Sequence, residues 1–105
     1  MIPDIYVHDG TLFRVLEEPE HARITMDVEL PILEREEQLE PRVLVFEDVC
    51  GYRVSEGCLK GCPTLLDFKV VGTEGRRSWV RLDTNCGFRE ILCGAVQMLK
   101  PDAAV

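Results

Sequence analysis

The feature that most constrains the fold is a strict alternation between residues 22 and 30. Apolar side chains occupy every second position, and Arg, Thr, Asp and Glu fill the positions between them. A period of two places the apolar side chains on one face of a β-strand, whereas a helix would spread them around its axis. The pattern therefore predicts a strand with one buried and one exposed face. Its apolar positions are Ala22, Ile24, Met26, Val28 and Leu30.

Other apolar segments, each bounded by turn residues, predict further strands. Thr11 to Glu18 should pair with residues 22–30 across the proline-containing turn 17–21. The acidic stretch 31–41 has proline at both ends and is expected to form a long hairpin loop. Later strands are expected at 43–46, with an extension to Val49, briefly around Tyr52 and Val54, and at 65–71, 78–82 and 88–99. The last segment is long enough to contain a bulge near Gly94.

A short edge strand is expected at Ile5–Val7, ending at the Asp9-Gly10 turn. The total is six or seven strands with no convincing helix. The predicted fold is all-β, either an antiparallel sandwich or an open, curled barrel. With 105 residues, 46% of them apolar and 30% charged, the chain has room for one globular domain, 1–105, whose residues 100–105 form a frayed tail.

The net charge of −7 is concentrated in the first part of the chain. Residues 1–60 carry 14 acidic and 6 basic side chains, whereas residues 61–105 carry 5 and 6. A surface that follows nucleic-acid phosphates needs clustered Lys and Arg, so nucleic-acid binding by the first half is disfavoured. An acidic surface instead favours encounter with a basic protein.

The acidic loop supplies the candidate partner-binding residues. They are Glu34, Glu36, Glu37 and Glu40. Charges at the rim of an interface accelerate association more than they tighten it. We therefore expect these glutamates to guide a basic partner, although a solvated acidic face explains the same pattern.

The five cysteines allow a second function, a metal-binding or redox site. Cys58 and Cys62 have spacing compatible with a zinc ligand pair, and Cys50 and Cys86 could complete a tetrahedral site. A second ligand pair is missing, however, and Cys93 fits an apolar packing position. An odd cysteine count without an export signal favours reduced thiols in the cytoplasm, with no cofactor, although a Cys58–Cys62 disulfide remains an alternative.

Catalysis has weak support. His8 and Asp9 are an acid–base pair by composition, but adjacent residues in an extended segment point to opposite faces, and a turn explains Asp9-Gly10 better. No serine or cysteine lies in a nucleophile motif, and no glycine-rich loop is followed by the Lys-Ser/Thr of a phosphate site. We therefore expect a protein without enzymatic activity.

One basic and aromatic cluster occurs, in which Arg77, Trp79 and Arg81 share a strand face. Such a face can stack a base or bind an anion. The simpler interpretation is that Trp79 is a core residue or is covered by arginine stems, while Arg77 and Arg81 pair with acids on a neighbouring strand.

The order of these elements resembles that of a group of small bacterial all-β proteins, some of which are placed among the immunity proteins of contact-dependent and polymorphic toxin systems. The residues that carry the resemblance are 8–12, the alternating strand 22–30, Phe46-Glu47-Asp48-Val49, and the strand after Asp83-Thr84-Asn85. The cysteine-rich loop 50–62 departs from that pattern. The resemblance implies a cytoplasmic binder without catalysis, and it supplies no binding residues.

Taken with the charge distribution, these observations predict a non-enzymatic protein-binding module with a basic protein partner. No apolar run is long enough for a membrane helix. An unpaired edge strand at 5–7 could also join two copies into a homodimer.

Overall fold

The alternating segment forms the strand β2 (Arg23–Ile32), in which buried residues alternate with half-exposed ones. The computed structural model describes residues 2–32, 35–57 and 60–101, with the backbone alone at 35–37. The remaining strands are β1 (Thr11–Glu18), β3 (Arg35–Glu47), β4 (Gly51–Glu56), β5 (Leu65–Glu74), β6 (Arg77–Thr84), β7 (Gly87–Cys93) and β8 (Ala95–Leu99). A 3-10 turn, η1 (Pro19–His21), links β1 to β2.

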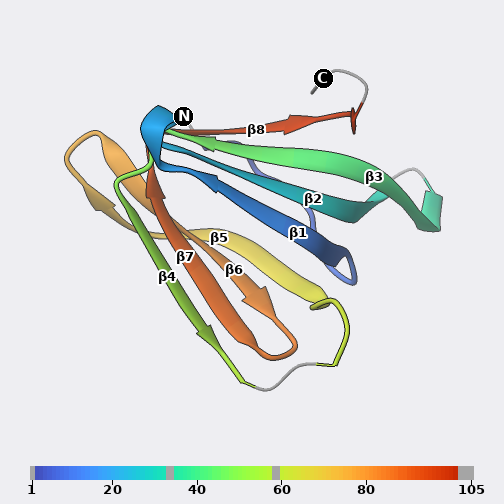
Figure 1. Cartoon of the computed structure of the whole chain (residues 1–105). Helices are drawn as coiled ribbons and strands as arrows, with labels where there is room; N and C mark the ends of the chain where they lie inside the picture. Colours follow the sequence, from blue (N-terminus) through green and yellow to red (C-terminus); the bar gives the residue numbers. More distant parts are fainter. Residues whose placement is uncertain (1, 33–34, 58–59, 102–105) are drawn as a thin grey trace.

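The strands form two antiparallel sheets that pack face to face (Figure 1). Sheet A has the order β1-β2-β3-β8, and sheet B has the order β4-β7-β6-β5. The sheets do not close into a barrel, so the sandwich alternative is confirmed. Their inner faces bury the core, whose largest fully buried side chains include Phe46, Met26, Leu44, Leu65 and Leu82. Among the described residues, no helix is long and apolar enough to span a bilayer.

The structure has eight strands rather than six or seven because the segment 88–99 divides. It leaves sheet B after Cys93 and enters sheet A at Ala95. A side chain at Gly94 would lie 2.7 Å from the Asp48 carboxylate, so the absence of a Cβ allows the crossing. The expected single strand with a bulge is therefore wrong.

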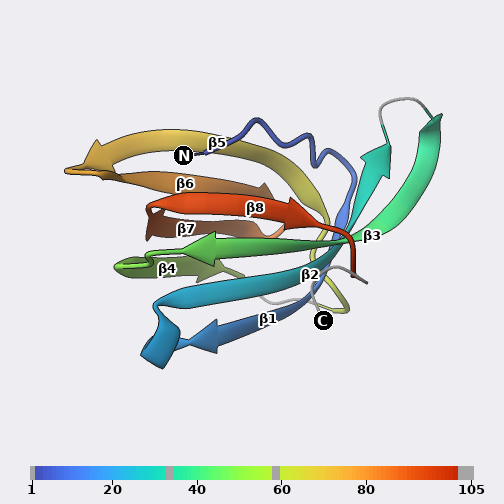
Figure 2. The same ribbon diagram turned by 90° about the horizontal axis from the view of Figure 1, so that it is seen from above.

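The expected hairpin loop at 31–41 is also wrong. Strands β2 and β3 continue through it as a paired arm, with Glu29 opposite Pro41 and Pro31 opposite Leu39. The arm extends past the neighbouring strands, so each of its strands has one open side (Figure 2). Proline lacks an N–H and is tolerated where no neighbouring strand needs that donor.

The N-terminal segment is not the edge strand expected at Ile5–Val7. It has no strand assignment, yet Ile5 and Val7 are buried and belong to the core. The Gly10 N–H donates to the Val7 carbonyl at 2.7 Å, and Asp9 has a φ of 66° in this turn. Hydrophobic burial fixes this segment without a hydrogen-bond ladder.

Candidate functional site

The outer face of sheet A forms a shallow groove of about 530 Å³, lined by all four of its strands. The pairing of the strands explains which side chains line the groove. Leu16 lies opposite Thr25, and Thr25 lies opposite Val45, so these side chains make one row across the face. The row ends at Gln97, which pairs with Val45. Four strands separated in sequence thus build one surface.

The middle of the groove is apolar. Val43 is buried although it lies on the outer face, and Val45 and Leu99 are half-buried. Leu16 is 48% exposed at the β1 side. Exposed apolar side chains grouped on the outside of a sheet favour binding, because apolar contact drives association.

Charged side chains on β1 and β2 lie beside this apolar floor. The Arg14 Nε donates to an Asp27 carboxylate oxygen at 2.9 Å. At the end near η1, Arg23 donates to both carboxylate oxygens of Glu18, at 3.0 and 3.1 Å. These hydrogen bonds lower the pKa of Glu18, so the carboxylate stays ionised. The groove therefore combines an apolar centre with a fixed, charged rim.

The ion pairs leave negative charge in excess. In the parts of the chain whose side chains are described, every arginine and Lys69 form ion pairs with acidic residues. Lys60 and Lys100 form no ion pair with an acidic side chain that the structure describes. The acidic residues outnumber the basic ones, and Asp4, Glu17, Glu29 and Glu74 have no ion pair among the described residues. The unneutralised surface charge is thus mainly negative.

The predicted docking glutamates lie on the arm, but only one is described with its side chain. Glu40 is half-buried and forms an ion pair with Arg42 at 3.2 Å, so a neighbour already neutralises its charge. Glu36 and Glu37 belong to β3, and their side chains are outside the described part. Glu34 also lies outside the described residues.

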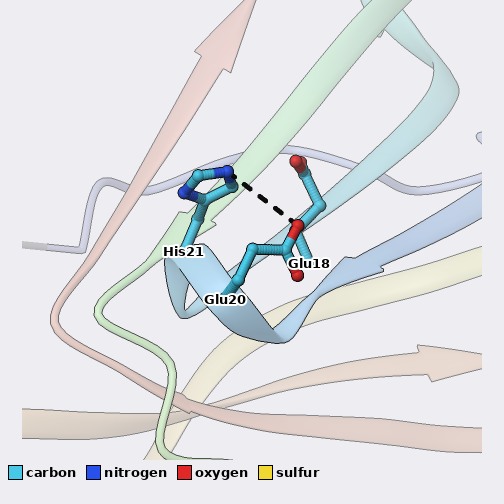
Figure 3. Close-up of side chains that lie close together, drawn as sticks. All are labelled: Glu18, Glu20 and His21. Carbon is cyan, nitrogen blue, oxygen red and sulfur yellow. Dashed lines mark ion pairs between the residues drawn. The ribbon is translucent and has the colours of Figure 1, made fainter.

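Three potential metal ligands meet at η1. Oxygen or nitrogen atoms of Glu18, Glu20 and His21 lie within 4.8 Å of one another (Figure 3). His21 Nε2 is 3.9 Å from a Glu20 oxygen. The side chains of Glu20 and His21 are more than half exposed, and both Glu18 oxygens accept hydrogen bonds from Arg23. A cation would have to compete with a guanidinium there, so this cluster is a poor metal site.

The proposed cysteine ligands do not gather among the described residues. Cys50 lies in the β3–β4 connection and Cys62 in the segment before β5, and both are exposed. Cys86 is half-buried in the β6–β7 turn, and Cys58 lies outside the described residues. No group of three potential ligands in the described chain includes a cysteine. Cys93 is fully buried, and burial raises the pKa of its thiol to about 11, which makes it a poor nucleophile.

His8 and Asp9 do approach each other, against the expectation that they point apart. His8 Nε2 lies 3.5 Å from an Asp9 oxygen because Asp9 adopts a left-handed turn conformation. Their side chains are 54% and 74% exposed, and the other ring nitrogen of His8 lies 3.3 Å from the Leu66 carbonyl oxygen. The pair lies on an exposed turn, where the solvent-excluded environment of an acid–base site is missing.

The cluster of Arg77, Trp79 and Arg81 is covered and paired within sheet B. The Arg53 guanidinium stacks over the Trp79 ring at 4.1 Å, and that of Arg81 over Phe88 at 3.9 Å. Arg77 donates to the Asp48 carboxylate at 2.9 Å. Both arginines are therefore engaged within the protein. Arg81 pairs with Glu90 on the neighbouring strand β7, whereas Arg77 pairs with Asp48 outside the strands, and Arg53 rather than Arg77 or Arg81 covers the tryptophan.

Sheet B also carries a polar cluster that the sequence did not indicate. The Arg89 guanidinium donates to both oxygens of Glu56, at 2.6 and 3.1 Å, and to the Tyr52 hydroxyl at 2.8 Å. The side chains of Arg89 and Glu56 are only 17% and 10% exposed. Because Arg89 follows an exposed turn in the sequence, only the pairing of β4 with β7 reveals this contact.

No protein-family model, curated protein or solved structure matches this chain.

Proposed function

We propose that the protein is a non-enzymatic protein-binding module, and that the groove on sheet A takes a basic, partly apolar segment of a partner protein. The observation that carries the proposal is the apolar floor of Val43, Val45 and Leu99, set within charged side chains on an outer sheet face. An apolar centre with a polar rim is the usual construction of a protein interface.

The excess of unpaired acidic side chains supports a basic partner. Long-range attraction depends on net charge, and rim charges steer the approach of an oppositely charged molecule. The resemblance to immunity proteins suggests one form of this proposal, in which the partner is a basic toxin. A toxin-like reading frame beside the gene would support that form.

The proposal can be tested with two labelled peptides of equal length, one alternating lysine with valine and the other alternating glutamate with valine. Fluorescence anisotropy should show binding of the lysine peptide only. The affinity should fall as salt rises, because salt screens attraction between exposed charges. Equal binding of both peptides, or binding of neither, would contradict the proposal.

A matched pair of variants locates the site. Val45→Lys places a positive charge in the apolar floor, and Ser55→Lys makes the same charge change on the outer face of sheet B. We expect Val45→Lys to weaken binding of the lysine peptide at least tenfold, or about 1.4 kcal/mol, and Ser55→Lys to weaken it less than twofold. Equal losses in the two variants would place the binding surface elsewhere.

A further inference from the structure

The side chains that line the groove on sheet A carry an excess negative charge, because two arginines and three carboxylates are among them. Arg14 Nε donates to the Asp27 carboxylate at 2.9 Å. Arg23 donates through Nε and Nη2 to both oxygens of Glu18. The third carboxylate, that of Glu47, forms no ion pair with a side chain that the structure describes. The excess charge of the groove therefore lies at Glu47.

A neutral amide is the hydrogen-bond donor to the Glu47 carboxylate. Gln97 Nε2 donates to Glu47 Oε1 at 3.2 Å, and the Gln97 side chain is exposed. Arg23 is close enough for its charge to interact with that of Glu47, but its donating nitrogens bond to Glu18. An ionised carboxylate accepts several hydrogen bonds through its two oxygens. Glu47 can therefore accept further bonds from a cationic donor on a partner.

Glu47 stands at one end of the apolar floor. It shares the outer face of β3 with Val45 and Val43, and β8 places Gln97 opposite Val45 and Leu99 opposite Val43. Outward side chains lie two residues apart on a strand, which corresponds to about 6.6 Å. The half of the groove built by β3 and β8 therefore has an acid at the end near η1 and apolar side chains at the other end.

We propose that Glu47 binds a lysine or arginine side chain of the partner, and that the bound segment carries apolar side chains at the second and fourth positions from that cation. The inference rests on the proposed binding at the groove and names the residue that recognises the basic partner. An extended segment repeats its outward side chains at the spacing of Glu47, Val45 and Val43. A hydrogen bond between a cation and a carboxylate is stronger than one between neutral groups, so a lysine or arginine competes well with the Gln97 amide.

Two peptides of identical composition and blocked termini test the position of the cation. One has lysine, valine and leucine in that order, with serine between them, and is used in both chain directions. The other has lysine between valine and leucine. Titration into ¹⁵N-labelled protein, followed by NMR, should show that the better end-lysine peptide binds about fivefold more tightly than the centre-lysine peptide. Equal affinity of the two peptides for the wild type would overturn the proposal without any variant.

Glu47→Gln removes the charge with little change in size, and Glu74→Gln makes the same change on exposed β5. We expect the affinity for the end-lysine peptide to fall about fivefold in Glu47→Gln and less than about twofold in Glu74→Gln. Glu47→Gln should also lose the preference between the two lysine peptides. Glu47→Asp keeps the charge and should retain that preference.

Glu47→Lys supplies a result that a merely structural role would not produce. It should favour the end-position peptide in which glutamate replaces lysine, because the charge at that end of the groove is reversed. A variant that still prefers the lysine peptide would overturn the proposal.

Failure of this inference differs from failure of the proposed function. If Val45→Lys weakens binding but Glu47→Gln binds the end-lysine peptide as the wild type does, the groove is a binding surface and the role of Glu47 is overturned. If no lysine peptide binds the wild type, or if Val45→Lys and Ser55→Lys weaken binding equally, the groove is not the binding surface and both proposals are overturned.

Discussion

The outer faces of the two sheets contrast in how their side chains are satisfied. On sheet B, six charged side chains form one ladder of ion pairs across all four strands. In order they are Arg53, Glu90, Arg81, Asp83, Lys69 and Asp67, three of each sign. On sheet A, two ion pairs join β1 to β2, and the apolar side chains of Val43, Val45 and Leu99 lie beside them on β3 and β8.

The contrast separates a face whose charged side chains pair with one another from a face with an apolar patch. In the ladder on sheet B, the charged side chains neutralise one another, and two of its arginines also stack on aromatic rings. In the described part of the chain, no element covers the apolar side chains on the outer face of sheet A. Polar substitutions should therefore affect folding more on sheet B than on sheet A.

The largest effect is expected at the polar cluster on sheet B. Glu56→Ala should lower the free energy of unfolding by about 2 kcal/mol, because it leaves the largely buried Arg89 guanidinium without its carboxylate. Urea denaturation followed by Trp79 fluorescence measures this change. Glu74→Ala, an exposed position in β5, should stay within about 0.5 kcal/mol of wild type. Similar losses in both variants would contradict the assignment.

A smaller loss is expected within the ladder itself. Glu90 is the shared partner of Arg53 and Arg81, and its side chain is 14% exposed. Glu90→Ala should destabilise by about 1 kcal/mol, since a charge within a network contributes more than an isolated surface pair. The matched change on sheet A, Glu47→Ala, should cost less in the same urea experiment. A larger loss of stability in Glu47→Ala than in Glu90→Ala would contradict the comparison between the faces.

The ladder should also respond to acid. Burial raises the pKa of Asp83, but hydrogen bonds from Arg81 and Lys69 lower it by more, so the net shift is downward. Its ionised carboxylate stabilises the fold above the unfolded-state value of about 3.9, and this stabilisation is lost as the pH falls through the lower folded-state pKa. The stability gap between wild type and Asp83→Asn should therefore shrink below about pH 4. A gap independent of pH would show that the charge contributes nothing.

The smallest expected effect concerns the cover over Trp79. Arg53→Ala removes the stacked guanidinium, which should cost about 0.5 kcal/mol because the arginine is largely exposed. The clearer result should be optical, since the only tryptophan becomes more accessible to acrylamide quenching. Unchanged quenching would show that Arg53 does not cover the ring in solution.

The sequence predicted the fold class because the strongest pattern, residues 22–30, reports directly on burial, although Ala22 itself ends η1 in a left-handed conformation and precedes β2. The errors have physical causes that one sequence does not display. Pro31 and Pro41 suggest a loop, but they lie in an arm whose strands have an open side. Gly94 suggests a bulge, but it marks the passage between sheets, which only the position of Asp48 explains.

The groove could not be predicted from the sequence, for a different reason. Leu16, Val45 and Leu99 come from strands far apart in the chain, and their common face depends on the order β1-β2-β3-β8. Val43 and Val45 belong to a run of consecutive apolar residues, which does not show which of them face outward. The excess of acidic charge was visible from composition, whereas its neutralisation at Glu40 by Arg42 required coordinates.

The placement of β8 also has a consequence for how the chain acquires its structure. Val43 pairs with Leu99, so sheet A stays incomplete until the last of the eight strands has left the ribosome. Contacts this distant in sequence slow folding, and a partly made chain exposes the free margin of β3. Nascent chains that end before Ala95 should therefore depend on chaperones and aggregate readily. The five residues of β8 complete the sheet and cover the margin of β3.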